Sequence, residues 1–376
     1  MKVIIAPDSF KGSLTALEAA RAIKKGIHNV DSNIETTLLP VADGGEGTMD
    51  TLVQTTDGKI HTYSVKDPLG RTVEASFGVL GDGKTCVIEI AQASGLLLLD
   101  DTEKNPLITS TYGTGQLILH ALDAGFRRFI IGLGGSATND AGVGMLRALG
   151  MEFVDKNGTP IKAGGGTLID LATIDVSKFD QRIAESTFII ASDVENPLTG
   201  KNGASLVFGP QKGATEEMVA KLDQSLTHLA NIIENNFGIS LHNEKGAGAA
   251  GGLGAALLAF FPAEMKSGID VVLRANNFYE HMKQANIVIT GEGKSDVQTL
   301  LGKAPYGIAT IAKKFNKPVI LISGVLEDET ILTASNMFTE MHAIVDGTVS
   351  KEESMLKTDV FLRRKTEEII TNYLQL

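Results

Sequence analysis

Five aspartates stand in short polar segments that directly follow apolar, strand-like runs of the chain: Asp8, Asp43, Asp140, Asp193 and Asp296. Aspartate is common in turns, and one or two of these residues fit helix caps, but five such placements exceed what turn formation needs. Carboxylates without a cluster of histidines or cysteines suit Mg²⁺, which keeps water and phosphate oxygens among its ligands. The seven histidines show no metal-ligand spacing, so we expect no zinc site.

Three lysines, Lys11, Lys294 and Lys303, lie in or beside the same polar segments. Phosphoryl transfer needs cations around the moving charge, a metal that bridges phosphate oxygens, and a group that orients the attacking hydroxyl. The lysines and aspartates together supply these groups, so the pattern favours phosphoryl transfer. For each lysine by itself, a solvated surface charge is the alternative.

The segment 131–144, I-G-L-G-G-S-A-T-N-D-A-G-V-G, follows an apolar run and precedes a helix-like segment that begins near Ala141. Small side chains leave backbone N–H groups open to a ligand, and the start of a helix favours an anion. This composition predicts a turn that holds phosphate. An ordinary glycine-rich turn is the alternative, and the segment by itself fits both.

Two generic nucleotide-binding patterns also occur. Residues 78–85, G-V-L-G-D-G-K-T, match the Walker A pattern, but the next residues read as a strand instead of a helix. Lys84 is therefore predicted on a hairpin turn. Residues 246–251, G-A-G-A-A-G, fit G-x-G-x-x-G without a preceding strand. We interpret them as close packing at a helix start, with ligand contact as the less favoured alternative.

The length, composition and charge of the chain exclude several classes of protein and partner. A chain of 376 residues has room for two or three domains, and 43% hydrophobic with 21% charged residues is typical of globular proteins. A net charge of -11 argues against nucleic-acid and anionic-membrane partners. One cysteine, Cys86, excludes an internal disulfide, and the missing G-x-S-x-G motif disfavours covalent acyl chemistry.

The apolar segments predict a cytoplasmic protein. The run at residues 2–7 is too short for a signal-peptide core, and it lacks a cleavage pattern. The longest apolar stretch, 247–263, is shorter than a bilayer span and rich in glycine.

Strand-like and helix-like segments alternate at the beginning of the chain. Residues 2–7 and 36–41 are predicted strands, each followed by a polar, glycine-containing loop and a helix. Thr15 and Glu18 form a capping box at the first helix, and the second helix begins near Met49. This alternation predicts a parallel α/β sheet.

The same alternation returns near residue 286. Strands are predicted at 286–290, 318–323 and 341–345, and a helix at 299–315. The segment 291–296, G-E-G-K-S-D, is predicted to be a polar loop.

Between the two ends, residues 60–66, 71–80 and 85–91 are strand-like and joined by tight turns, which predicts an antiparallel meander. The simplest sheet therefore joins residues 1–64 with 282–376. Five parallel strands in a flavodoxin-like order place the loops after the first and third strands at the topological switch point, where open α/β sheets bind ligands. Those loops carry Asp8, Ser9, Lys11, Glu292, Lys294 and Asp296.

Seven segments, in this order and spacing, together resemble the bacterial glycerate kinases of the type that makes 2-phosphoglycerate. They run from the first residues nearly to the last strands, and seven long motifs in order are far more specific than either generic pattern. The segments are P-D-S-F-K-G-S-L (7–14), A-D-G-G-E-G-T (42–48), G-L-G-G-S-A-T-N-D-A-G (132–142), D-V-E-N-P-L-T-G (193–200), F-G-P-Q-K-G-A (208–214), G-A-G-A-A-G-G-L-G (246–254) and G-E-G-K-S-D-V-Q-T (291–299).

The resemblance implies an α/β protein of two domains. Residues 1–64 and 282–376 would form a flavodoxin-like (Rossmann-like) three-layer domain. Residues 65–281 would form an inserted mixed α/β domain with a restriction-endonuclease-like segment. The implied reaction is transfer of the ATP γ-phosphoryl group to a hydroxyl of D-glycerate with Mg²⁺, with 2-phosphoglycerate as the favoured product, in the phosphorylation and catabolism of organic acids. Monomer and homodimer both stay open.

Roles follow for residues in and beside the seven motifs. Ser9, Lys11, Lys294 and Lys303 would bind the glycerate carboxylate or the transferring phosphate. Asp8, Asp43 and Asp193 are candidates for Mg²⁺ contact and for orienting or deprotonating the hydroxyl, in no particular order. The other substrate and phosphate contacts would come from Gly44, Gly45, Glu46, Gly134, Gly135, Ser136, Thr138, Asn139, Asp140, Asn196, Gly291, Glu292, Asp296 and Gln298.

One position departs from the family's pattern, because Lys294 stands where an arginine usually follows G-E-G. Lysine keeps the charge but cannot clamp an anion through two parallel hydrogen bonds, so anion binding at this position is expected to differ in detail.

Two other function classes fit parts of the pattern. A nicotinamide-linked oxidoreductase of a small hydroxy acid would explain the glycine loops, but the first strand lacks the dinucleotide fingerprint. A non-catalytic, two-lobed binding module would bind glycerate without consuming ATP.

Overall fold

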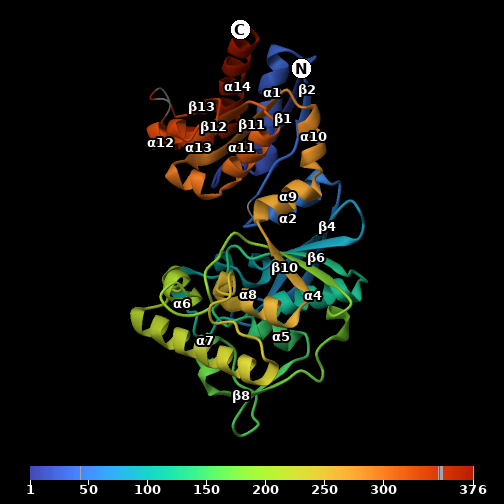
Figure 1. Cartoon of the computed structure of the whole chain (residues 1–376), viewed down its shortest axis with the longest axis vertical. Coiled ribbons are helices and arrows are strands. Elements are labelled where there is room, and N and C mark those ends of the chain that lie inside the picture. The colour runs from blue at the N-terminus through green and yellow to red at the C-terminus, as the bar shows by residue number, and fades with distance from the viewer. Residues whose placement is uncertain (43, 346, 348–349, 376) are drawn as a thin grey trace. The chain divides into compact units, whose positions relative to one another are not determined.

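The computed structural model describes residues 1–42, 44–345, 347 and 350–375. The chain divides into two compact units, each described here by itself (Figure 1). Unit 1 comprises Met1–Asp43, Asp50–Asp57 and Ile269–Leu376, and unit 2 comprises Gly44–Met49 and Gly58–Gly268. We keep the division into two folding domains as a proposal.

Unit 1 contains a five-stranded parallel sheet in the order β13-β12-β11-β1-β2. Read along the chain, this is the predicted flavodoxin-like order, with the first strand between the second and the third. The strands are β1 (Lys2–Ile5), β2 (Glu35–Leu38), β11 (Ile287–Ser295), β12 (Val319–Leu326) and β13 (Glu340–Ala343).

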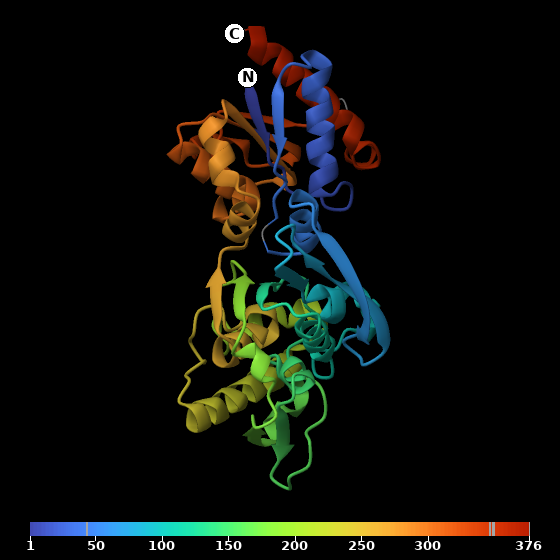
Figure 2. The same cartoon turned by 90° about the vertical axis from the view of Figure 1, so that its right-hand side faces the viewer.

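Helices cover both faces of this sheet. Figure 2 shows α1 (Ala16–Val30) and α14 (Thr358–Gln375) together on one face, and α10 (Phe278–Gln284) and α11 (Ala304–Lys314) on the other. The predicted capping box starts α1, where the Thr15 Oγ1 accepts from the Glu18 N–H at 3.2 Å and Glu18 Oε2 accepts from the Thr15 N–H at 2.9 Å. Unit 1 also contains α2 (Thr48–Thr55, shared with unit 2), α9 (Gly268–Ala275), α12 (Glu329–Ala334) and α13 (Lys351–Leu356).

Glycine allows α1 and α14 to approach each other closely. A Cβ added at Gly26 would lie 2.6 Å from the carbonyl oxygen of Arg363 and 2.8 Å from the Thr366 Cβ. The two helices pack against each other on this face of the sheet, and α14 crosses α1 obliquely in Figure 2.

Two predictions near residue 295 were wrong. The segment 291–296 is not a loop, because β11 continues to Ser295 and pairs with β12, with Glu292 opposite Ser323 and Lys294 opposite Val325. The helix predicted at 299–315 is a short 3-10 turn, Val297–Leu301, followed by α11. Gly302, at a φ of 108°, separates the two.

Unit 2 contains a six-stranded mixed sheet in the order β10-β9-β6-β5-β4-β3. The first three strands along the chain form the predicted antiparallel meander, and the remaining neighbours pair in parallel. The strands are β3 (Lys59–Lys66), β4 (Thr72–Val79), β5 (Thr85–Glu89), β6 (Arg128–Gly132), β9 (Thr187–Ala191) and β10 (Ala263–Lys266), with a separate hairpin of β7 (Glu152–Asp155) and β8 (Leu171–Asp175).

The core of unit 2 lies between this sheet and its helices. Side chains from β5, β6 and β9 pack with those of the helices in one apolar cluster. The helices are α3 (Ala91–Ser94), α4 (Tyr112–Asp123), α5 (Val143–Ala148), α6 (Ala204–Phe208), α7 (Glu216–Phe237) and α8 (Ala249–Phe260). Among the residues that the structure describes, no helix combines the length and apolar character needed to cross a bilayer.

The Walker A-like residues 78–85 lie on the β4–β5 hairpin, as predicted. The Leu80 N–H donates to the Thr85 carbonyl at 2.9 Å, and Asp82 Oδ1 accepts from the N–H groups of Lys84 and Thr85 at 2.8 and 2.9 Å. The backbone amides that a phosphate-binding loop presents to its ligand are therefore partly used by Asp82.

We expect Lys84→Ala to leave the KM for ATP and kcat unchanged, because its side chain lies on an exposed hairpin tip and not at the start of a helix. Steady-state kinetics at varied ATP concentration test this. A several-fold rise in the KM for ATP would show that the hairpin contacts the nucleotide.

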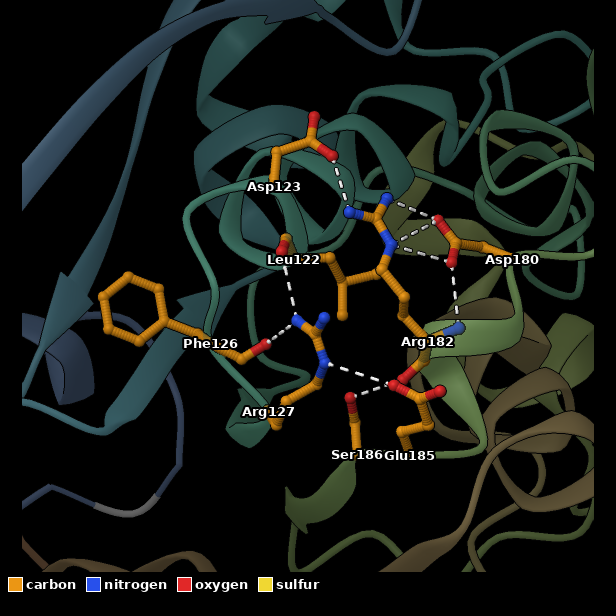
Figure 3. Close-up of polar contacts among 8 residues, drawn as sticks. All are labelled: Leu122, Asp123, Phe126, Arg127, Asp180, Arg182, Glu185 and Ser186. Carbon is orange, nitrogen blue, oxygen red and sulfur yellow. Dashed lines mark hydrogen bonds and ion pairs between the residues drawn. The ribbon is translucent and has the colours of Figure 1, made fainter.

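Arg182 organises an ion-pair network at the surface of unit 2 (Figure 3). Its guanidinium group donates to Asp180 Oδ2 at 2.7 Å and to Asp123 Oδ1 at 2.8 Å. Nearby, Arg127 donates to the carbonyl groups of Leu122 and Phe126 at 3.1 and 2.8 Å. The network ties the end of α4 to the segment before β9.

We expect Arg182→Gln to lower the free energy of unfolding by no more than about 1 kcal/mol, because the ion pairs are partly exposed and screened by solvent. The Arg182 hydrogen bonds hold the pKa of Asp180 below its usual range. These hydrogen bonds therefore stabilise the fold above the ordinary pKa of aspartate. Their contribution to the free energy of unfolding is lost as the pH falls through the lowered pKa of Asp180 in the folded protein.

Calorimetry from pH 7 to pH 3 tests this expectation. The difference in Tm between wild type and Arg182→Gln should be largest at neutral pH and shrink in acid. Lys201→Gln, at an exposed lysine of the same unit, is the control. If the difference in Tm does not change with pH, the Arg182–Asp180 ion pair is not the source of the lost stability.

Candidate functional site

The loop after β1 lies against the end of β11 in unit 1. The Asp8 N–H donates to the Gly291 carbonyl at 2.8 Å. A Cβ added at Gly293 would lie 3.3 Å from the backbone nitrogen of Lys11, so glycine allows this approach. The structure thus brings the two loops predicted at the switch point together, although the second is the end of a strand.

Glu292 is held at this end of β11 by hydroxyl groups. Its Oε1 accepts from Ser295 Oγ at 2.8 Å and from Thr299 Oγ1 at 2.7 Å, and its Oε2 lies 3.9 Å from Lys303 Nζ. Burial raises the pKa of Glu292, while the two hydroxyl groups and the Lys303 ammonium group oppose that shift. The carboxylate is therefore fixed in position.

Two lysines flank Asp296 beside Glu292. Lys294 Nζ lies 2.9 Å from Glu327 Oε2 and 3.4 Å from Asp296 Oδ2, and Lys303 Nζ lies 3.8 Å from Asp296 Oδ1. The Lys294 and Lys303 side chains are 51% and 35% exposed, so both ammonium groups remain accessible. The pairs hold the lysines in place where an anion can reach them.

The other residues predicted in unit 1 have mostly local roles in this structure. Asp296 caps the 3-10 turn by accepting from the Gln298 N–H at 2.9 Å. The Ser9 N–H donates to Asp8 Oδ1 at 2.6 Å, and Lys11 is exposed. Asp43 lies outside the described residues.

The glycine turn of unit 2 has an accessible part and a buried part. Gly135 is exposed and Gly134 half-buried, whereas the rest of the turn through Asp140 is buried. The predicted helix start is α5, which begins at Val143. Contact with a ligand is therefore open to Gly134 and Gly135, and the buried side chains of Ser136, Thr138, Asn139 and Asp140 shape the turn.

Asp140 connects the glycine turn to the backbone of Thr111 and to the start of α5. Its Oδ2 accepts from the Thr111 N–H at 2.8 Å and from the Thr111 hydroxyl at 2.9 Å, and the N–H groups of Gly142 and Gly144 donate to the carboxylate at 3.2 Å. Burial raises the pKa of Asp140, and these donors oppose the shift. Asn139 likewise donates from Nδ2 to Ser205 Oγ at 2.9 Å.

The loop Gly44–Met49 lies directly against this turn within unit 2. A Cβ added at Gly134 would lie 2.5 Å from the Gly45 Cα, and one added at Gly44 would lie 2.7 Å from the Ala191 carbonyl oxygen. The predicted phosphate-binding segments of motifs 42–48 and 132–142 are therefore neighbours. Glu46, in the first of them, is exposed.

The segment after β9 carries Asp193 and Asn196. Asp193 is exposed, and Asn196 Nδ2 donates to the Asn202 carbonyl at 2.9 Å. The G-A-G-A-A-G segment packs on the glycine turn, because a Cβ at Gly251 would lie 2.0 Å from the Thr138 carbonyl oxygen. This contact confirms the packing interpretation of that segment.

Two buried charged residues that contact the glycine turn or the loop Gly44–Met49 were not predicted from the sequence. Glu89, at the end of β5, accepts from the Met49 N–H at 2.7 Å and so fixes the loop Gly44–Met49. Lys212 donates to Ser136 and to Thr138. A signal for Lys212 was present, because it is the one charged residue of the motif 208–214.

Within the described ranges, no three His, Cys, Asp or Glu side chains are grouped as metal ligands. Asp43, one of the three predicted Mg²⁺ candidates, lies outside these ranges.

Comparison with known proteins gives one consistent result. A model of the glycerate kinase family matches residues 3–374. The glycerate kinase of Halalkalibacterium halodurans is 49% identical over 98% of this chain and 97% of its own. The glycerate 2-kinase of Escherichia coli (strain K12) is 50% identical over 88% of this chain and 86% of its own.

The fold agrees as well. A crystal structure assigned as glycerate kinase 2 from Salmonella typhimurium LT2 superimposes with a TM-score of 0.91 at 44% identity, over 100% of both chains. Neither the oxidoreductase nor the non-catalytic binding module finds support in these comparisons.

Proposed function

This chain belongs to the glycerate kinase family, and on that premise we propose that it transfers the γ-phosphoryl group of ATP to the 2-hydroxyl group of D-glycerate. The observation that supports this most is the family match over residues 3–374, which spans all seven motifs. The 2-position is supported by the relative named glycerate 2-kinase, which is 50% identical to this chain.

We assign the anion-binding role in unit 1 to Lys294 and Lys303, with Ser9 and Lys11. The two ammonium groups are accessible and held by Asp296 and Glu327, so they are already in place for a carboxylate or phosphate group. Little rotamer entropy then remains to be lost on binding. Glu292 keeps Lys303 near β11.

The phosphate-binding role in unit 2 falls to Gly134 and Gly135 and to the adjacent loop Gly44–Gly47. Backbone N–H groups in such glycine segments can approach phosphate oxygens without side-chain interference. Mg²⁺, when bound, neutralises charge on those oxygens. Asp8, Asp43 and Asp193 are the proposed residues for holding the ion or for orienting and accepting the proton of the glycerate hydroxyl.

A coupled assay of ADP release tests the proposed function. We expect release to require both D-glycerate and Mg²⁺, and to be lost when EDTA removes the metal. Hydroxypyruvate and other small hydroxy acids serve as competing candidates. Phosphorus NMR of the product then identifies the phosphorylated hydroxyl. Glycerate binding without ADP release would instead indicate a binding module.

A further inference from the structure

Lys212 is a fully enclosed lysine behind the glycine turn. It ends the 3-10 turn Pro210–Lys212, and only 2% of its surface is exposed. Lysine is among the residues least often buried in this way, because its charge is costly to remove from water. Its position therefore needs an explanation beyond packing.

The ammonium group contacts two residues of the turn. Nζ donates to Ser136 Oγ at 2.8 Å and to the Thr138 carbonyl oxygen at 2.7 Å. An ammonium group has three donors, so one donor is left over after these two bonds. The residue between them, Ala137, is fixed separately through its N–H to the Ser94 carbonyl at 2.9 Å and its carbonyl to Thr109 Oγ1 at 2.9 Å.

Lys212 has no ion-pair partner within 4.0 Å in the part of the chain that the structure describes. Asp140 is the charged neighbour that acts on it, but that carboxylate already accepts from Thr111, Gly142 and Gly144. Lys104, whose carbonyl oxygen packs on the adjacent Gly213, is itself paired with Asp101 at 2.6 Å. Burial lowers the pKa of Lys212 to about 7, and Asp140 opposes this shift.

An incompletely compensated buried ammonium group does not stabilise a fold, because its desolvation outweighs two hydrogen bonds to neutral acceptors. Ser136, which Lys212 contacts, directly follows Gly134 and Gly135, the accessible residues of the turn, so the ammonium group brings positive charge close to them in the chain. Strongly shifted titratable groups of this kind are concentrated at functional sites.

We propose that Lys212 is a positioning residue for phosphate binding, whose ammonium group fixes Ser136 and Thr138 and supplies positive charge close to Gly134 and Gly135. The inference rests on the proposed kinase function and adds a residue and a role to it. Lys212 itself is not placed in contact with the substrate.

Lys212→Met tests the proposal, because methionine fills a similar volume without the charge. We expect calorimetric titration with a non-hydrolysable ATP analogue to show at least about tenfold weaker binding and kcat/KM for ATP to fall about 100-fold, as for a lost charge-assisted contact. The Tm should change by only a few degrees, because removal of an incompletely compensated charge offsets the loss of the hydrogen bonds to Ser136 and Thr138. Lys201→Met, at an exposed lysine of the same unit, is the matched control.

The pH dependence provides a second readout. As the pH rises from 6 to 8, Lys212 loses its proton. The affinity of the wild-type protein for the analogue should therefore fall toward that of Lys212→Met. Protonation of the γ-phosphate affects both proteins equally, so it cancels in the ratio of their affinities for the analogue at each pH.

Two results would overturn the proposal: unchanged analogue affinity in Lys212→Met, or failure of this variant to fold, which would give the lysine a structural role. Analogue affinity also separates this proposal from the proposed function. Wild-type protein that binds the analogue but does not phosphorylate glycerate would refute the glycerate kinase activity and leave the role of Lys212 to be judged by the binding data.

Discussion

Asp193→Asn is expected to lower kcat by about 100-fold or more, because a carboxylate that transfers a proton or orients the attacking hydroxyl contributes at least that much. Asp193 is exposed just after β9, in the same unit as the glycine turn and the loop Gly44–Met49. Asparagine keeps the shape of the side chain and removes its charge and basicity. The measurement is kcat from ADP release at saturating ATP and glycerate.

Asp8→Asn is the parallel experiment in unit 1, and Asp170→Asn, at an exposed aspartate outside the motifs, is the control for both. Activity of either variant should be measured over a range of Mg²⁺ concentrations. Recovery at high Mg²⁺ assigns that aspartate to the metal, and no recovery assigns it to the hydroxyl. Unchanged turnover in both variants would remove them from the mechanism.

Gly134→Ala is expected to reduce kcat/KM for ATP by about 100-fold, which is typical of a displacement near 1 Å at a reacting centre. The new Cβ would lie 2.5 Å from the Gly45 Cα, and backbone cannot yield as a flexible side chain can. The turn and the loop Gly44–Met49 must therefore move apart. Both are proposed to bind phosphate groups, so ATP binding should weaken more than glycerate binding.

Gly158→Ala separates this effect from the general cost of replacing glycine. Gly158 lies in the same unit with a φ of 78° and nothing within 4 Å of an added Cβ. Alanine there costs about 1 kcal/mol of backbone strain and leaves the site unchanged. The hypothesis fails if both variants lose activity equally, or if Gly134→Ala retains wild-type kinetics.

Much of the fold followed from local patterns. The capping box at Thr15 and Glu18 and the meander between residues 59 and 89 were predictable because they depend on neighbouring residues. The extension of β11 to Ser295 was not, because the pairing partner of Lys294 is Val325, which is distant in the sequence. Polar residues in that segment favoured a loop, and pairing with β12 overrode this preference.

The candidate site shows a similar division. The residue types in 132–142 indicated a ligand-binding turn, but not which side chains point inward. Two of the four donors to the buried Asp140 come from Thr111, in another part of the chain. The partners of Lys212, Ser136 and Thr138, are likewise remote in the sequence. The residue types of a segment indicate what chemistry it can perform. Which of its side chains point inward depends on contacts that form only in the folded chain.

The continuation of β11 through Glu292 and Lys294 fixes the distance between these two residues along the backbone. Consecutive residues on a strand are about 3.3 Å apart, so alternate residues such as these are separated by about 6.6 Å along the strand. Ladder pairing with Ser323 and Val325 prevents this interval from adapting as a mobile loop would. The backbone therefore holds the proposed anion-binding lysine, Lys294, at a constant interval from Glu292, and a bound anion has to adapt to this interval.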